Sequence, residues 1–141
     1  MERLILLALL LLSSESALAN EAPEIVYQVL CAESASEGQA GMDAVAVVMV
    51  NRAVGSLAKL EDVVTRPKQF SAYNDRKWLD SWLAKNYTPK VRQMAQRAIE
   101  RALTEPRPAW THYHTVDVRP YWTKGHKGVR VGRHVFYWGI K

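Results

Sequence analysis

Glu33 is the residue whose position in this sequence is best suited to acid–base chemistry. It stands between an apolar stretch that ends at Ala32 and a segment with two glycines, after which a second apolar run, Met42–Val50, begins. A carboxyl group between a packed wall and an open cleft can hold a proton near neutral pH, because desolvation disfavours its charged form. Such a group can serve as the general acid that cleaves a glycosidic bond.

Hydrolysis of a glycosidic bond usually requires a second carboxylate, about 5–5.5 Å from the first for retention and about 6.5–9.5 Å for inversion. The candidates are Glu37, Asp75 and Asp117. Glu37 follows Glu33 by four residues, but the glycine-bearing loop does not fix both on one helix face. Its alternative role is to close the loop by binding backbone amides or Arg52. Asp75 and Asp117 are expected to be solvated loop residues.

Hydrophobic periodicity indicates the elements that must position these groups. It predicts helices over Glu24–Ala32, Met42–Arg52, Asp80–Leu83 and Pro89–Leu103, a loop over Ala35–Gly41, a turn over Leu60–Val64 and an irregular segment over Thr65–Tyr73. The Met42–Arg52 helix is apolar nearly all round and is expected to lie at the centre. Aromatic and β-branched residues between Trp110 and Trp138 predict a small irregular β region. The expected fold class is α+β, mostly α, in one domain over residues 20–141.

The N-terminus has the features of an export signal. The apolar run Leu4–Leu12 is too short to span a bilayer comfortably, and Ala17-Leu18-Ala19 provides a small-x-small cleavage pattern. We therefore expect residues 1–19 to be a secretory signal peptide that contacts the membrane transiently, with an uncleaved anchor as the alternative. The protein is then exported to the periplasm or the cell wall. Cys31 is the only cysteine, so no internal disulfide is expected.

The net charge is +5, and it becomes +6 when residues 1–19, with two glutamates and one arginine, are removed. A basic exported domain suits an anionic partner such as a cell-wall polymer, a membrane surface or a nucleic acid. Charge alone does not choose among these partners.

Several motifs occur in the order found in a known enzyme family. Glu33-Ser34, Glu37, Gly41, Ala44-Val45-Ala46 and Asn51-Arg52 resemble the opening motif of the spore-cortex-lytic and related cell-wall hydrolases. Gln69-Phe70-Ser71-Ala72 resembles the Gln-Phe-Ser segment of that family, His112-Tyr113-His114 its tyrosine-rich strand, and Trp122 with Val131–Phe136 its closing strand. The sequence departs from the family at Ser36, where glycine is common, and between Tyr113 and Trp122, where an Asn-Pro turn is usual.

The resemblance implies a lysozyme-like domain that cleaves peptidoglycan glycan strands between N-acetylmuramic acid and N-acetylglucosamine, as a lytic transglycosylase. Glu33 matches the catalytic acid of the family. It would protonate the leaving oxygen and then take the proton of the 6-hydroxyl of the same muramyl sugar, which closes an anhydro ring without water. No cofactor, no metal and no nucleic-acid partner are expected, and the protein is expected to be a monomer. A hydrolytic muramidase is the alternative.

The candidate substrate-binding residues mix hydrogen-bonding and stacking groups, which suits sugar rings. They are Glu37, Gln69, Phe70, Ser71, Tyr113, Trp122 and His134. Structural roles remain open for several of them: Phe70 can anchor its loop in the core, and His134 can be an inward, hydrogen-bonded histidine. Asn51 can orient Glu33 or the substrate, or cap its helix.

Three other functional classes fit parts of the sequence. His112 and His114, with His126 or His134, suggest a zinc peptidase, but no histidine precedes residue 112. Cys31 with His112 or His114 suggests an amidase or endopeptidase, although a lone cysteine in an apolar helix usually packs in the core. A wall- or nucleic-acid-binding module would use the basic residues Lys124, Lys127, Arg130 and Arg133.

Overall fold

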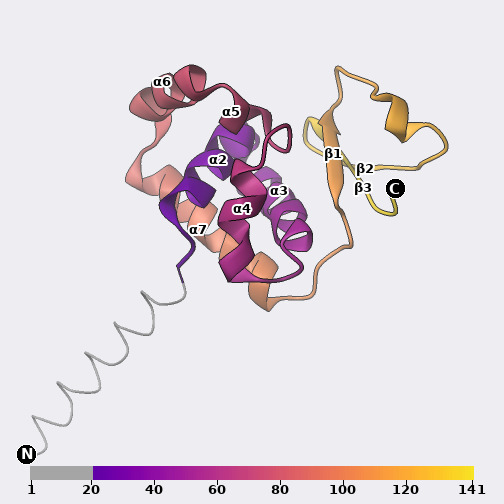
Figure 1. The fold of residues 1–141 in the computed structure, drawn as a ribbon, viewed down its shortest axis with the longest axis horizontal. Helices are drawn as coiled ribbons and strands as arrows, with labels where there is room; N and C mark the ends of the chain where they lie inside the picture. Colours follow the sequence, from indigo (N-terminus) through magenta and orange to yellow (C-terminus); the bar gives the residue numbers. More distant parts are fainter. Residues whose placement is uncertain (1–20) are drawn as a thin grey trace, which may run out of the picture.

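One buried helix, α3 (Gly38–Arg52), forms the centre of the molecule (Figure 1). The structure is a computed structural model that describes residues 21–141. Residues 42 and 44–50 of α3 are all buried, as its apolar sequence predicts. Helices α2 (Glu24–Ser34) and α7 (Pro89–Thr104) pack against it. The predicted signal segment, residues 1–19, and its predicted membrane contact lie outside the described residues.

The chain reverses between α2 and α3 more tightly than expected. The predicted loop over Ala35–Gly41 is wrong, because a short 3-10 helix, η1 (Ala35–Glu37), leads directly into α3. Gly38 has a φ of +70°, a backbone conformation that turns the chain at once and that glycine adopts without strain. Gly41 lies inside the first turn of α3, where an added Cβ would collide with the Cβ of Glu37.

The middle of the chain is more helical than its polar sequence predicts. A 3-10 helix, η2 (Leu57–Lys59), precedes α4 (Leu60–Thr65), where only a turn was predicted, and α5 (Ser71–Asn74) begins inside the segment predicted to be irregular. Helix α6 (Arg76–Asn86) is much longer than the predicted Asp80–Leu83. Its start is fixed by Asp75, whose side chain accepts a hydrogen bond from the Trp78 amide at 3.0 Å.

A three-stranded antiparallel sheet follows α7, in the strand order β1-β3-β2. Its strands are β1 (His112–Thr115), β2 (Val129–Val131) and β3 (His134–Tyr137). The register pairs Tyr113 with Phe136, and these two residues lie on the face that packs on the helices. His114 pairs with Val135, which pairs with Arg130, so this row lies on the outer face. The mostly helical architecture with a small sheet confirms the expected fold class.

Within residues 21–141, no single helix is long and apolar enough to cross a membrane. The only stretch that meets the length and composition criteria joins Glu24–Arg52 to Leu57–Thr65 and is bent by 92°.

Asn51, at the end of α3, joins the helical part to the sheet. Its side-chain amide donates to the carbonyl oxygens of Pro108 at 2.9 Å and Trp110 at 2.8 Å. Its oxygen accepts a hydrogen bond from Arg107 Nε at 2.6 Å. The Asn51 side chain therefore neither contacts Glu33 nor caps α3, and Asn51 does not line the cleft where it could orient a substrate. Asn51 instead fixes the path of the chain between α7 and β1.

Replacement of Asn51 by alanine should lower the free energy of unfolding by about 1–3 kcal/mol, because backbone carbonyl groups between α7 and β1 lose their donors. Chemical denaturation measures this loss. Asn86→Ala is the control, since Asn86 donates only to the Trp82 carbonyl one turn earlier, on the exposed part of α6. Its effect should stay within about 0.5 kcal/mol. Equal losses in the two variants would contradict the role of Asn51.

Candidate active site

A cleft of about 700 Å³ separates the end of α2 from the inner face of the sheet. Glu33 lines it from the last turn of α2, Gln69 and Phe70 from the preceding loop of α5, and Ser71 from α5 itself. Tyr113 and His134 line it from β1 and β3. The structure thus brings six of the eight predicted site residues to one cleft. Glu37 and Trp122 are not among the residues that line it.

The Glu33 carboxylate is held by donors from two distant segments. Its Oε1 accepts hydrogen bonds from the Ala72 amide at 2.9 Å and the Ser71 hydroxyl at 3.3 Å, both in the first turn of α5. Its Oε2 accepts from the Tyr113 hydroxyl at 2.8 Å. Hydroxyl groups can also accept a hydrogen bond, so two of the three partners remain suitable when this carboxyl carries a proton. The site can therefore accommodate both protonation states of Glu33.

Tyr113 is a fixed donor in this arrangement. Burial, together with the negative charge of Glu33, raises the pKa of Tyr113 well above its usual value. Its ring stacks on Phe136, with ring centroids 5.5 Å apart, and meets the His134 ring edge to face at 5.1 Å. The sheet therefore sets the direction from which Tyr113 reaches Glu33.

Glu37 lies away from the cleft and holds the hairpin between β2 and β3 in place. Its Oε2 accepts a hydrogen bond from the Arg133 amide at 3.0 Å, and its carboxylate lies against Gly132, where a Cβ would collide with it. The sequence left two roles open for Glu37, and the one in which it binds a backbone amide describes this contact. Arg52, its other suggested partner, binds elsewhere.

Arg52 connects the Gln69-Phe70 segment to the start of β1. Its guanidinium donates to the Thr111 carbonyl at 2.8 Å, to the Gln69 carbonyl at 3.3 Å and to Gln69 Oε1 at 3.2 Å. It also lies 5.1 Å from the centre of the Phe70 ring. Phe70 is only 1% exposed, so it anchors this loop in the core, and the polar groups around it face the cleft.

His134 is buried, as predicted for an inward histidine, but it is not hydrogen-bonded in the way that was expected. Its Nδ1 has no hydrogen-bond partner among residues 21–141. Burial lowers the pKa of His134, although the charges of Glu37 and Glu33 oppose this effect. This nitrogen is itself buried, so His134 forms part of the packed wall behind the cleft, and its Nδ1 does not face a ligand.

The model of a family described as Cell Wall Hydrolase matches residues 36–137, well over half of the chain. The chain belongs to this family. Neither the comparison with curated proteins nor that with solved structures gave a match. The matched range includes the Gln69-Phe70-Ser71 segment and all three strands, and it begins three residues after Glu33. Membership implies a peptidoglycan-degrading role outside the cytoplasm.

Sequence analysis missed several residues of this cell wall hydrolase that line the cleft. Trp78 in α6 and Val118 after β1 are 45% and 50% exposed there, and Lys68 and Asn74 lie beside them. Asn74 accepts a hydrogen bond from the Lys68 amide at 2.9 Å, which stabilises Lys68 at a φ of 63°. The turn at Lys68 and the start of α6 at Arg76 bring Lys68, Asn74 and Trp78 to the cleft. Asp75, a residue type that favours the N-cap position, was a signal for the earlier start of α6.

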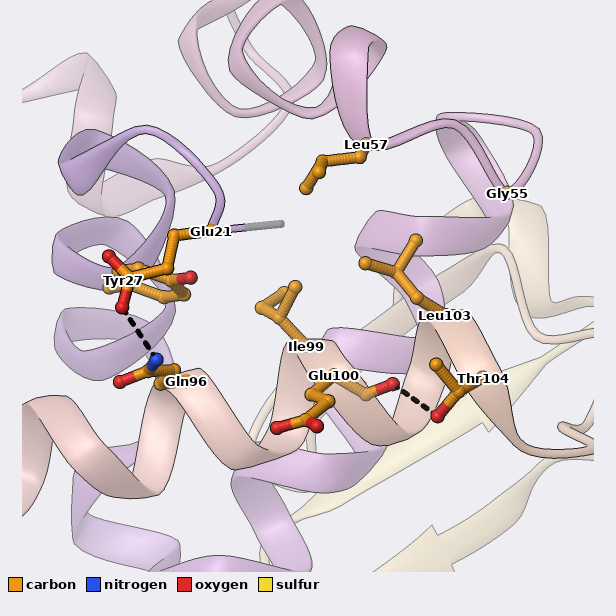
Figure 2. A pocket seen from close by; sticks show the side chains of 9 residues that line it. All are labelled: Glu21, Tyr27, Gly55, Leu57, Gln96, Ile99, Glu100, Leu103 and Thr104. Atoms are coloured by element: carbon orange, nitrogen blue, oxygen red, sulfur yellow. Dashed lines mark hydrogen bonds between the residues drawn. The ribbon is translucent and has the colours of Figure 1, made fainter. Parts of the chain in front are cut away.

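A second hollow, of about 530 Å³, lies between the start of α2, η2 and α7 (Figure 2). Its apolar walls are Leu57, Ile99 and Leu103. Two of its polar side chains already have partners, because Gln96 donates to Glu21 at 2.8 Å and Thr104 donates to the Glu100 carbonyl at 2.8 Å. It therefore lacks the converging polar groups that distinguish the cleft at Glu33.

The other two enzyme classes lose their key residues in this structure. Burial raises the pKa of the Cys31 thiol to about 12, and the thiol contacts the Val91 carbonyl, so Cys31 is a core residue. The nitrogens of the His114 ring lie 2.6 Å from the Thr115 carbonyl and 2.9 Å from the Tyr137 hydroxyl. In residues 21–141, no group of three or more His, Cys, Asp or Glu side chains could hold a metal ion.

The low pKa of His134 should make the protein less stable in mild acid. The unfolded chain binds a proton at this imidazole near pH 6.5, whereas the folded chain binds it only at lower pH. The contribution of His134 to the free energy of unfolding is therefore complete above about pH 6.5 and declines as the pH falls through the pKa of the folded state. The decline should be smaller for His134→Gln than for the wild type, as measured by denaturation between about pH 7 and about pH 5. An NMR titration that places this imidazole at or above pH 6.5 would contradict the prediction.

Proposed function

We propose that this cell wall hydrolase is a lytic transglycosylase that cleaves the bond between N-acetylmuramic acid and N-acetylglucosamine. One observation carries the proposal: Glu33 is the only acidic residue that lines the cleft, among residues 21–141. Asp75 caps α6, Asp117 pairs with Arg133, and Glu37 binds the hairpin. A mechanism that requires only one carboxylate fits this arrangement better than one that requires two.

In the proposed reaction Glu33 acts first as an acid and then as a base. Its proton moves to the glycosidic oxygen, the bond from that oxygen to C1 of the muramyl sugar breaks, and N-acetylglucosamine leaves with a free 4-hydroxyl. The 6-hydroxyl of the same muramyl sugar then bonds to C1 and gives its proton to Glu33. The negative charge of Glu33 stabilises the cationic sugar between these steps. The nucleophile belongs to the substrate, so its high effective concentration replaces a bound water.

The remaining cleft residues suit the binding of a sugar chain. Ser71, Tyr113 and His134 lie around Glu33 in the cleft. The side-chain oxygen of Gln69 accepts a hydrogen bond from Arg52, whereas its amide nitrogen takes no part in that contact. Phe70 anchors its loop in the core, and Glu37 binds the hairpin that carries His134. Trp122 contacts His112, His114 and Tyr137 on the outer face of the sheet, so a role for it in binding requires substrate beyond the cleft.

The proposed site belongs to one catalytic domain over residues 20–141. We expect the protein to be exported, to lose residues 1–19 and to act on peptidoglycan as a monomer. A hydrolytic muramidase with a second carboxylate is the alternative. No residue of the described cleft favours it.

Glu33→Gln should lower the rate of glycan cleavage by about 100- to 10,000-fold, because the amide cannot donate the required proton. Glu37→Gln is the matched control. Its amide oxygen can still accept from the Arg133 amide, so activity should stay within severalfold of the wild type. Turbidity loss of purified cell walls measures both. Full activity of Glu33→Gln would overturn the proposal, and an equal loss in Glu37→Gln would favour a mechanism with two carboxylates.

Digestion of purified walls should give muropeptides with 1,6-anhydromuramyl ends, because the substrate hydroxyl and not water attacks C1. Mass spectrometry distinguishes these ends from reducing ends, which are heavier by one water. The glycan should be cut in both cases. Reducing ends as the main product would identify a muramidase and rule out the transglycosylase.

A further inference from the structure

The positive charge of this protein is concentrated in its last thirty residues. Residues 112–141 contain six lysines and arginines and one aspartate, so their net charge of +5 equals that of the entire sequence. The sequence alone did not distinguish a solvated basic face from a binding surface. The arrangement of these residues around the sheet makes that distinction.

A hollow of about 330 Å³ lies on the outer face of the sheet, opposite the face that carries Tyr113. Arg119, His126 and Arg130 line it, and no Asp or Glu is among its lining residues. Asp117 is the nearest acid in sequence, but it pairs with Arg133 at 2.5 Å. Within residues 21–141, the side chains of Arg119 and His126 make no hydrogen bond or ion pair, and Arg130 contacts only the Gly132 carbonyl.

The two arginines, held together without counter-ions in a concave surface, repel one another and attract anions. Arginine binds carboxylates especially well, because its planar guanidinium can donate two parallel hydrogen bonds. The Thr123 side chain, which also lines the hollow, donates to the Pro120 carbonyl and so leaves the recognition to the cations. The chemistry of the hollow therefore suits a small carboxylate.

The hollow adjoins the cleft at Glu33. His114 and Val118 line both, because β1 is an edge strand and the chain after it passes over the edge of the sheet. Because the two hollows share these lining residues, the substituents of a glycan strand in the cleft have a continuous path to this edge. Those substituents are stem peptides with free carboxylates, which are anions on the substrate itself.

We propose that this hollow, with Arg119 and Arg130 as its main donors, binds the carboxylates of the stem peptide of a glycan strand held in the cleft. The inference rests on the proposed function. It makes the enzyme selective for muramyl residues that carry peptides. A single-stranded nucleic acid is the other polyanion that interleaved cations and aromatic rings can bind, and the test includes it.

The test compares two substrates: intact glycan strands with stem peptides, and the same strands after an amidase has removed the peptides. Arg119→Gln with Arg130→Gln should lower kcat/KM about tenfold on intact strands, the scale of one charge-assisted contact. The same variant should cleave stripped strands at nearly the wild-type rate. Lys90→Ala is the control for loss of charge, because Lys90 is exposed on α7 and should affect neither substrate.

Equal losses on both substrates, or no loss on either, would overturn the proposal. Arg119→Gln alone keeps the test valid if the Arg130 variant is unstable, since the Arg119 side chain makes no hydrogen bond or ion pair within residues 21–141. A wild-type enzyme that cuts neither substrate would instead mean that the proposed function has failed. Tighter binding of a single-stranded oligonucleotide than of an N-acetylmuramyl peptide, measured with Glu33→Gln protein, would also overturn the proposal.

Discussion

The hydrogen bonds to Glu33 are the constraint on which the rest of the structure depends. A carboxylate at the end of α2 accepts from α5, 38 and 39 residues later, and from β1, 80 residues later. A carboxyl group taken partly out of water needs such partners, since an unpaired one would be costly. The segments that supply them must therefore dock accurately. The last turn of α3 provides this, because Asn51 binds the chain before β1 and Arg52 binds both Thr111 and the Gln69 segment.

The buried character of α3 explains why its last two polar residues can act as anchors. A helix that is apolar nearly all round cannot shift along its axis without disturbing the packing of α2 and α7. Its end is thus a fixed point in the molecule. The side chains of Asn51 and Arg52 reach two chain segments from that point, and each segment carries a donor for Glu33. A stable core in this way determines the geometry of an open cleft.

The sequence predicted the central helix, the small sheet and most of the residues around Glu33, because these follow from apolar periodicity and local composition. It failed for Asn51 and for the segment before α3. The partners of Asn51 lie 57 and 59 residues away, which no local pattern contains. The tight reversal depends on the left-handed backbone of Gly38 and on the close approach of Glu37 to Gly41, which are local features that apolar periodicity does not report. Trp122 was assigned to the cleft because its type suits sugar binding, but the type of a residue does not tell on which face of a sheet it lies.

The alternation of side chains along β1 separates two tasks. Tyr113 points to the helices and holds Glu33, whereas His112 and His114 point outward, where Trp122 covers them. A shift of this strand by one residue would exchange the two faces and place a histidine at the carboxylate. Several contacts oppose such a shift: Tyr113 stacks on Phe136, Arg52 binds Thr111, and Glu37 fixes the hairpin at Arg133. The carboxylate that first seemed to be a partner of Glu33 in catalysis thus helps to keep the strand in register, and the cleft is left with one acid.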